Sequence, residues 1–338
     1  MRTTGLAALL ALVLLAAPRL AAADNIVFVD RSGQIARIDP DRPGARVVVP
    51  AAQNVPWEGI SQADDGTIVA MRGERIYRFS PKGRFVNRLE TAVSSAPARS
   101  RPSTIGPWDP EISPDGRFVA YWWAYNFQLV LPTLLDGLGD LTSSLRPGRL
   151  LPELLFSYSI ARIEAPGHFE DGDIGGGWPS WYGNSRILLG NHRRPLLLYE
   201  LLDNRKRKLA WFQDDGGMRH FLVPRLSRNG KWLAVIQAPQ LAVSQRRAPR
   251  TMRIYRMNGD APKLPRGSCA VAPRARIFSE VSWSPDGTRL AWADGRGIWI
   301  ARAPERLEGF DRPCVFSTPP RLVVPGGAEP HWGPSPLL

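Results

Sequence analysis

The sequence is poor in several kinds of residue, and each shortage excludes a class of protein. Only two cysteines occur in 338 residues, which excludes a disulfide-rich miniprotein and any zinc cluster built on cysteine. The four histidines, at positions 168, 192, 220 and 331, show no H-x-x-x-H spacing. The chain also lacks a G-x-S-x-G nucleophile elbow, a phosphate-binding loop and a dinucleotide fingerprint. The sequence therefore gives no catalytic nucleophile and base.

Acidic residues are fewer than basic ones: the sequence has 31 Asp and Glu against 44 Lys and Arg, which gives a formal charge of +13. Nearly all of the basic residues are arginines. They cluster at Arg193–Arg194, Arg205–Lys208 and Arg246–Arg250. One interpretation is an arginine-rich rim that binds an anionic cell-surface polymer. The other is loop charge that only keeps an arginine-rich protein in solution. Nucleic acid is not an expected partner of an exported protein.

Long apolar runs are limited to one, which lies within residues 1–23. Arg2 precedes the apolar run 6–17, and small residues end at Ala23, which is the pattern of a secretory signal peptide. We expect cleavage before Asp24 and export to a periplasm or to the outside of the cell. A membrane anchor is the alternative, although the run is short for a membrane span. In an oxidising compartment Cys269 and Cys314 are candidates for a disulfide, with two separate thiols as the alternative.

Glycine, proline and tryptophan, in contrast, are abundant, and they fall in a repeated pattern. Residues 281–302 read VSWSPDGTRLAWADGRGIWIAR, which predicts three short antiparallel strands joined by tight turns. Similar segments stand at 57–71, 110–123, 178–190 and 224–236, and a truncated copy stands at 329–338. Successive copies are 45 to 69 residues apart. Such a period, with about four strands in each copy, is typical of a β-propeller.

Six starting strands predict six blades. The last copy has only its first strand, whereas residues 25–49 read as three strands that lack a first one. We therefore expect an all-β, six-bladed β-propeller over residues 24–338, closed by the N- and C-terminal strands in one blade. Two adjacent β-sandwiches would not explain why the chain ends complement each other.

A Leu- and Pro-rich insertion at 126–155 interrupts the second blade. Its leucines either pack against one another and against the blade beneath, or they contact a partner or a membrane.

The pattern S-P-D-G-x-x-[LV]-A resembles the repeat of the TolB-like family of six-bladed propellers. It stands at Ser113–Ala120 and Ser284–Ala291, and looser versions stand at 63–70, 182–189 and 227–234. The resemblance extends over roughly residues 24–338 and implies closure of the ring by both termini. The Asp and Gly of the pattern build a turn and are not ligands. TolB itself carries an additional N-terminal domain, for which this chain has no room.

Function in a propeller is expected at the axial channel, close to the start of each innermost strand. When the copies are aligned on their turns, Asp109, Glu280 and Glu329 occupy equivalent positions, with Glu58 at approximately the same position in its copy and Val223 and Trp178 in the other two. Glu111 and His331 lie two residues further along their strands, and Trp57, Trp108 and Trp178 adjoin the acidic positions. We predict an acidic, Trp-flanked ring of ligand contacts at the channel mouth. The alternative is a set of hydrated carboxylates paired with the abundant arginines.

These features predict an exported, monomeric, non-catalytic module that recognises a protein, a peptide or a cell-envelope ligand at the channel. No cofactor is expected. The alternative is a metal-dependent lyase or hydrolase at the same channel, with the carboxylates and His331 as metal ligands. A channel-bound metal ion therefore stays an open question at this point.

Overall fold

The computed structural model describes most of the chain that follows the predicted signal peptide. The described residues are 24–49, 56–91, 104–125, 155–163, 169–171, 177–190, 195–202, 205–212, 219–239, 250–260, 263–271, 278–305, 307 and 312–337. The predicted signal peptide, and all but the last residue of the predicted insertion 126–155, lie outside them. Within these ranges every regular element is a strand, and no helix is long and apolar enough to span a membrane.

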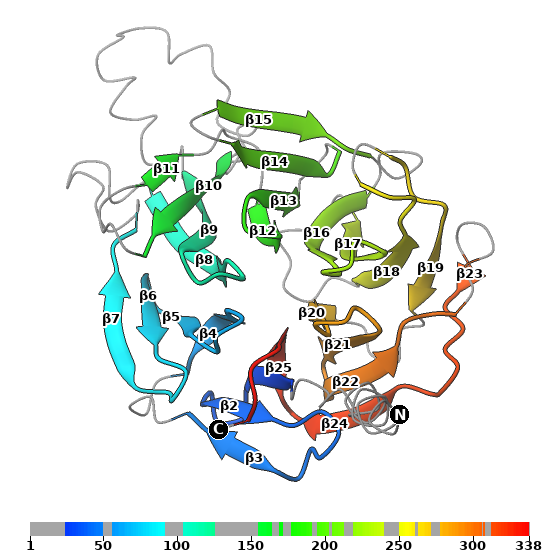
Figure 1. The fold of residues 1–338 in the computed structure, drawn as a ribbon, viewed down its shortest axis with the longest axis horizontal. Helices are drawn as coiled ribbons and strands as arrows, with labels where there is room; N and C mark the ends of the chain where they lie inside the picture. Colours follow the sequence, from blue (N-terminus) through cyan, green and yellow to red (C-terminus); the bar gives the residue numbers. More distant parts are fainter. Residues whose placement is uncertain are drawn as a thin grey trace, which may run out of the picture.

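The described strands form six sheets that surround a common axis in a β-propeller arrangement (Figure 1). We name the sheets A to F in ring order. From the innermost strand outward, the first three are sheet A, β25 (Ala328–Gly333), β1 (Asn25–Val29), β2 (Ile35–Ile38) and β3 (Arg46–Val48); sheet B, β4 (Glu58–Gln62), β5 (Ile68–Arg72), β6 (Arg75–Phe79) and β7 (Phe85–Leu89); and sheet C, β8 (Thr104–Ile112), β9 (Phe118–Tyr125), β10 (Leu155–Arg162) and β11 (Phe169–Asp171).

The other three sheets follow the same plan, and sheet E has a fifth strand. They are sheet D, β12 (Gly177–Tyr182), β13 (Arg186–Gly190), β14 (Leu197–Leu202) and β15 (Arg205–Ala210); sheet E, β16 (Arg219–Leu226), β17 (Trp232–Pro239), β18 (Thr251–Arg256), β19 (Gly267–Val271) and β23 (Arg312–Pro313); and sheet F, β20 (Phe278–Trp283), β21 (Arg289–Asp294), β22 (Gly297–Arg302) and β24 (Arg321–Pro325).

Sheet A joins the two ends of the described chain. β25 pairs antiparallel with β1, with Trp332 opposite Ile26 and His331 opposite Val27. The buried Asn25 side chain donates to the carbonyl oxygen and to Oγ of Ser335, at 2.6 and 2.8 Å. This is the closure that the complementary ends of the sequence predict.

The repeated Ser-Pro-Asp-Gly segments form the turns that follow the innermost strands. In sheet F, Ser284 Oγ donates to Asp286 Oδ1 at 2.6 Å, and the same carboxylate oxygen accepts the Thr288 N–H at 3.0 Å. Gly287 has a φ of +68°, a conformation that glycine adopts without strain. The aspartate is fully used by the turn, so the structure confirms that the motif is a structural one.

The core lies between neighbouring sheets, and tryptophans from the repeat connect the innermost strands there. The Trp181 indole of sheet D donates to the Glu111 carbonyl of sheet C at 2.7 Å. The Trp283 indole of sheet F donates to the Arg225 carbonyl of sheet E at 2.9 Å. Each ring buries a large apolar surface while its polar N–H is satisfied. These contacts fix the relative positions of the strands that line the axis.

Candidate functional site

Each innermost strand contains an irregularity in its pairing that lies just before the axial residues. The register shifts in all six inner strand pairs. In five of these strands a residue at the irregularity has a positive φ, at Gly59, Asp109, Trp178, Val223 and Glu329, and β8 has a second one at Gly106. Positive φ is uncommon for residues other than glycine and marks positions that the surrounding structure holds in place. β-Bulges of this kind redirect the side chains that follow them.

One residue in each innermost strand stands two positions after Gly59, Asp109, Trp178, Val223, Glu280 or Glu329, and all of these residues but Ser61 line a cavity that the six innermost strands enclose. These residues are Ser61, Glu111, Ser180, Arg225, Ser282 and His331. The serines connect neighbouring strands. Ser61 Oγ donates to the Pro110 carbonyl at 2.9 Å, and Ser282 Oγ accepts the Trp332 N–H at 2.9 Å. The three ionisable members of the set contact one another directly or through a shared partner.

Arg225 is the centre of this cluster. Its guanidinium forms an ion pair with Glu111 of sheet C and a second one with Glu280 of sheet F at 2.6 Å. It also donates to the Pro179 carbonyl of sheet D at 3.0 Å. Although burial opposes it, the three carboxylates at Glu111, Glu280 and Asp109 raise the pKa of Arg225, which stays positively charged. One arginine thus connects four sheets across the axis.

His331 of sheet A adds the remaining connections. Its Nδ1 accepts the Gln62 N–H of sheet B at 3.3 Å, and its Nε2 lies 3.2 Å from Glu111 Oε2. Because Nδ1 is an acceptor, Nε2 carries the proton and donates to Glu111. Burial works against ionisation of Glu111, but Arg225 and His331 more than offset it and lower its pKa. Glu111 is therefore an ionised, fully paired carboxylate.

Three other carboxyl groups, those of Asp109, Glu280 and Glu329, have a raised pKa instead. Burial raises the pKa of Asp109, against the opposing effects of a hydrogen bond from Trp122 and the charge of Arg225. Burial, reinforced by Asp109, Glu111 and Glu329, raises the pKa of Glu280 well above its usual range. These carboxyl groups are crowded in a poorly solvated region where the arginines do not balance them.

Glu329 of sheet A also has a raised pKa. Burial, the charge of Asp109 and the charge of Glu58 raise its pKa to about 8, although the backbone N–H groups of Gly59 and Ile60 donate to it. Its Oε2 atom is buried and has no hydrogen-bond partner. Arg250 is the second arginine near Asp109 and Glu280, and burial lowers its pKa. We call Asp109, Glu280 and Glu329 the acidic cluster.

Three tryptophans lie in a row beside the acidic cluster. The Trp122 ring is between those of Trp108 and Trp178, with centroid distances of 4.5 and 4.9 Å and planes inclined by 40°. The Trp122 N–H donates to Asp109 Oδ2 at 2.6 Å. The acidic cluster thus adjoins a wall of aromatic surface.

A cavity at the axis is lined by Arg225 but by none of the three residues of the acidic cluster. Equivalent residues of the innermost strands meet one another, so these strands run in the same direction. In their strands, Asp109, Glu280 and Glu329 stand two residues before Glu111, Ser282 and His331, whereas the cavity is lined by residues from the level of Arg225 onward and by the following turns. The cavity measures about 290 Å³, and all six innermost strands contribute to its wall. Across it, Arg228 of the sheet E turn forms an ion pair with Asp64 of the sheet B turn, on the opposite side of the ring.

The structure brings together most of the residues that the sequence alignment selects, with two corrections. Gly59 rather than Glu58 occupies the bulge position of sheet B, so that assignment is wrong by one residue. Glu58 is exposed but still raises the pKa of Glu329. Trp57 is only 4% exposed and packs edge-on against Tyr77 and Phe79 between sheets A and B, so it is a core residue.

Sequence alone missed Arg225, Trp122 and Arg250. Arg225 has the same strand position as Glu111 and His331, so the alignment could have selected it. The sequence is rich in arginine, however, so this arginine did not stand out as a candidate site residue. Nothing in the sequence indicates that Trp122 packs between Trp108 and Trp178.

The interpretation as a metal-dependent enzyme needs several of these side chains to converge as ligands. Among the described residues, no group of three His, Cys, Asp or Glu side chains is placed to hold a metal ion. Glu111 and His331 face each other and Arg225 instead.

The predicted rim of arginines is described only in part. Arg205–Lys208 lie on β15, which is the outermost strand of sheet D. Residues 193–194 and 246–249 lie outside the described residues.

Comparisons with known proteins give similarity in fold alone. No family model matches the chain, and no curated protein matches it either. Among solved structures, a protein provisionally designated TolB from Agrobacterium tumefaciens is 12% identical with a TM-score of 0.48, and the match covers 83% of this chain and 85% of that one. The hydrazine synthase of Kuenenia stuttgartiensis is 9% identical with a TM-score of 0.45, over 82% of this chain and 75% of that one.

Proposed function

We propose that this chain is an exported, six-bladed propeller that binds a protein or peptide ligand at its axis, and that a basic group of the ligand contacts the acidic cluster. The observation that carries the proposal is the raised pKa of three neighbouring carboxyl groups, Asp109, Glu280 and Glu329. They are carboxyl groups without enough positive charge around them.

A cation removes that imbalance. A lysine ammonium or an arginine guanidinium beside Glu329 would pair with its free Oε2 atom and favour the ionised form. The row of Trp108, Trp122 and Trp178 offers flat aromatic surface to the apolar stem of such a side chain, and cation–π contacts add to the attraction.

The six sheets and their closure through β25 and β1 support the six-bladed assignment. Export is supported by the pattern of residues 1–23 and by the disulfide between Cys269 and Cys314, since disulfides persist in oxidising compartments. Whether the compartment is a periplasm or the outside of the cell does not affect the binding chemistry.

The test is a peptide display screen against the purified protein at pH 7. We expect the selected peptides to share a Lys or Arg, and we expect replacement of that residue by Gln to abolish capture. The double variant Glu280→Gln/Glu329→Gln should lose the same peptides, whereas Glu58→Gln on the exposed edge should keep most of the affinity. Selected peptides without a basic residue, or full capture by the double variant, would refute the proposal.

Calorimetry provides an independent measurement. Because the acidic cluster holds protons that a bound cation displaces, binding near pH 7 should release protons. The apparent binding enthalpy should therefore depend on the ionisation enthalpy of the buffer. Equal enthalpies in phosphate and Tris would show that the cluster is not the binding site.

A further inference from the structure

A second cavity lies far from the axis, in the gap between sheets E and F. It measures about 240 Å³. Its wall consists mostly of aromatic and proline side chains, with one acidic and one basic residue: Val271, Phe278, Trp292, Asp294, Arg296, Trp299, Cys314, Phe316, Pro319 and Pro320. We call it the rim pocket.

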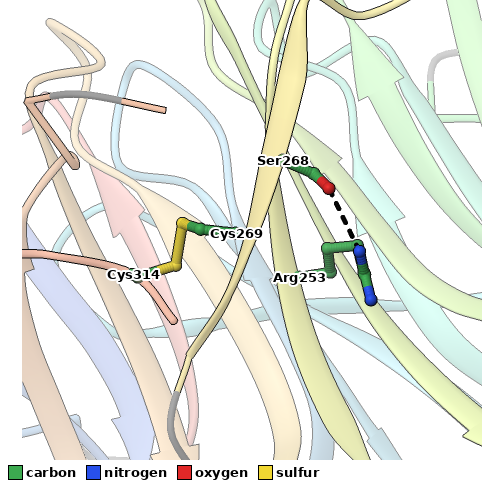
Figure 2. The surroundings of a disulfide bond; sticks show 4 residues. All are labelled: Arg253, Ser268, Cys269 and Cys314. Carbon is green, nitrogen blue, oxygen red and sulfur yellow. Dashed lines mark hydrogen bonds between the residues drawn. A yellow bond between two sulfur atoms is a disulfide. The ribbon is translucent and has the colours of Figure 1, made fainter. Parts of the chain in front are cut away.

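A cross-linked segment forms the outer wall of the rim pocket. The chain leaves β22 of sheet F, and β23 then pairs in parallel with β19 of sheet E before the chain returns to sheet F as β24. The disulfide between Cys269 of β19 and Cys314 fastens this segment (Figure 2). Cys269 projects from β19 on the side opposite to Ser268, whose hydroxyl accepts a hydrogen bond from Arg253 at 3.1 Å. Residues 314–320 are thus held across the gap between the two sheets.

The floor of the pocket is one face of the β21–β22 hairpin. Trp292 pairs with Trp299, and Asp294 pairs with Gly297. Since side chains alternate along a strand, Trp292, Asp294 and Trp299 share a face, with Asp294 and Trp299 as diagonal neighbours. Phe316 of the cross-linked segment stacks on Trp292 at 6.3 Å with the planes inclined by 18°. The pocket therefore has flat aromatic surfaces and one polar end.

The polar end has a donor and an acceptor. Asp294 is buried, accepts the Arg296 N–H at 2.8 Å, and its Oδ2 lies 3.7 Å from the Arg296 guanidinium. That guanidinium lies 4.5 Å from the centre of the Trp299 ring. The Trp299 indole N–H is buried and has no acceptor. A buried donor without a partner destabilises the protein, and an acceptor brought by a ligand would remove this cost.

We propose that the rim pocket binds a small planar aromatic compound that carries a hydroxyl group, that is, a phenol. A hydroxyl oxygen accepts from the Trp299 N–H, and its hydrogen is donated to the Asp294 carboxylate. The ring packs between Trp292, Phe316 and the two prolines. An aromatic ring without a hydroxyl group would satisfy neither polar partner. This proposal does not rest on the function proposed for the axis.

The probe for the test is 4-fluorophenol, with fluorobenzene as its matched control, observed by fluorine NMR on the full-length protein. The two compounds have similar rings and differ in the hydroxyl group. We expect saturable binding of 4-fluorophenol, with fluorobenzene at least about tenfold weaker because two hydrogen bonds are missing. Equal affinities for the two compounds, or no saturable binding, would overturn the proposal.

Two variants locate the site. Phe316→Ala should weaken 4-fluorophenol binding at least about tenfold, whereas Val315→Ala, next to it and 71% exposed, should not change it. Trp299→Phe keeps an aromatic ring but removes the N–H. It should weaken 4-fluorophenol and leave fluorobenzene unchanged, which an unfolded variant would not do. Wild-type affinity for 4-fluorophenol in both Phe316→Ala and Trp299→Phe would place the binding elsewhere.

Discussion

Glu329 gives the structure a dependence of stability on pH that one substitution should remove. The folded protein holds its carboxyl group with a pKa of about 8, against an ordinary value of 4.5. Between these two pH values the folded state keeps a proton that the unfolded state releases. The free energy of unfolding therefore decreases as the pH rises through this window. Glu329→Gln carries no ionisable group, so it should lose this contribution.

The size of the effect follows from the two pKa values. Each unit of pKa corresponds to about 1.4 kcal/mol, so the ceiling is between about 4 and 5 kcal/mol above pH 8. The glutamine keeps an oxygen for the Gly59 and Ile60 N–H groups, but Asp109 and Glu280 readjust when Glu329 is neutral. We expect Glu329→Gln to be more stable than the wild type by about 1 to 3 kcal/mol at pH 9 and equal to it at pH 4.5.

Urea denaturation at pH 4.5, 7 and 9 measures this difference, provided that the slope with urea stays the same. Glu74→Gln is the matched control, since the same chemical change at an exposed position that does not contribute to the pKa of Glu329 should have little effect at any of the three pH values. The reasoning would be refuted if the free energies of unfolding of the wild type and Glu329→Gln differed by the same amount at all three pH values.

Three further predictions follow from the axis and the rim. Arg225→Met leaves Glu111 and Glu280 buried without their partner, so the free energy of unfolding at pH 7 should fall by roughly 3–5 kcal/mol; a fall below about 1 kcal/mol in urea titrations would contradict the central role of Arg225. Reduction of Cys269–Cys314, which are 45 residues apart, should lower the unfolding free energy by up to about 4 kcal/mol, and an unchanged urea midpoint under reducing conditions would argue against it. If the rim binds an anionic polymer, replacing the four basic residues of β15 by Gln should lower the salt concentration that elutes the protein from heparin; unchanged elution would leave these residues only a role in solubility.

The fold was predictable because its determinants are local and repeated. A Ser-Pro-Asp-Gly turn such as that at Ser284–Gly287 is specified by hydrogen bonds within a few residues, and the sequence shows it directly. The join between β25 and β1 was predictable for a different reason. Each end of the chain lacks the strands that the other end has.

The site was predictable only in part, because its chemistry comes from distant residues. The alignment found Asp109, Glu280 and Glu329 from their spacing to the turns. It did not show that Arg225 would pair with Glu111 and Glu280, since these three residues come from three different sheets. The raised pKa values come from burial and from neighbouring charges, and neither can be calculated before the sheets are placed.

The position of β25 also sets an order of events during synthesis. Residues 25–48 emerge from the ribosome early, but the strand that covers the inner edge of β1 is about 300 residues later in the chain. Until residues 328–333 are made, the ring stays open and the edge of β1 remains unpaired. A chain that stops before residue 328 lacks β25 and cannot complete sheet A. Closure of sheet A therefore takes place only after residues 328–333 have been synthesised.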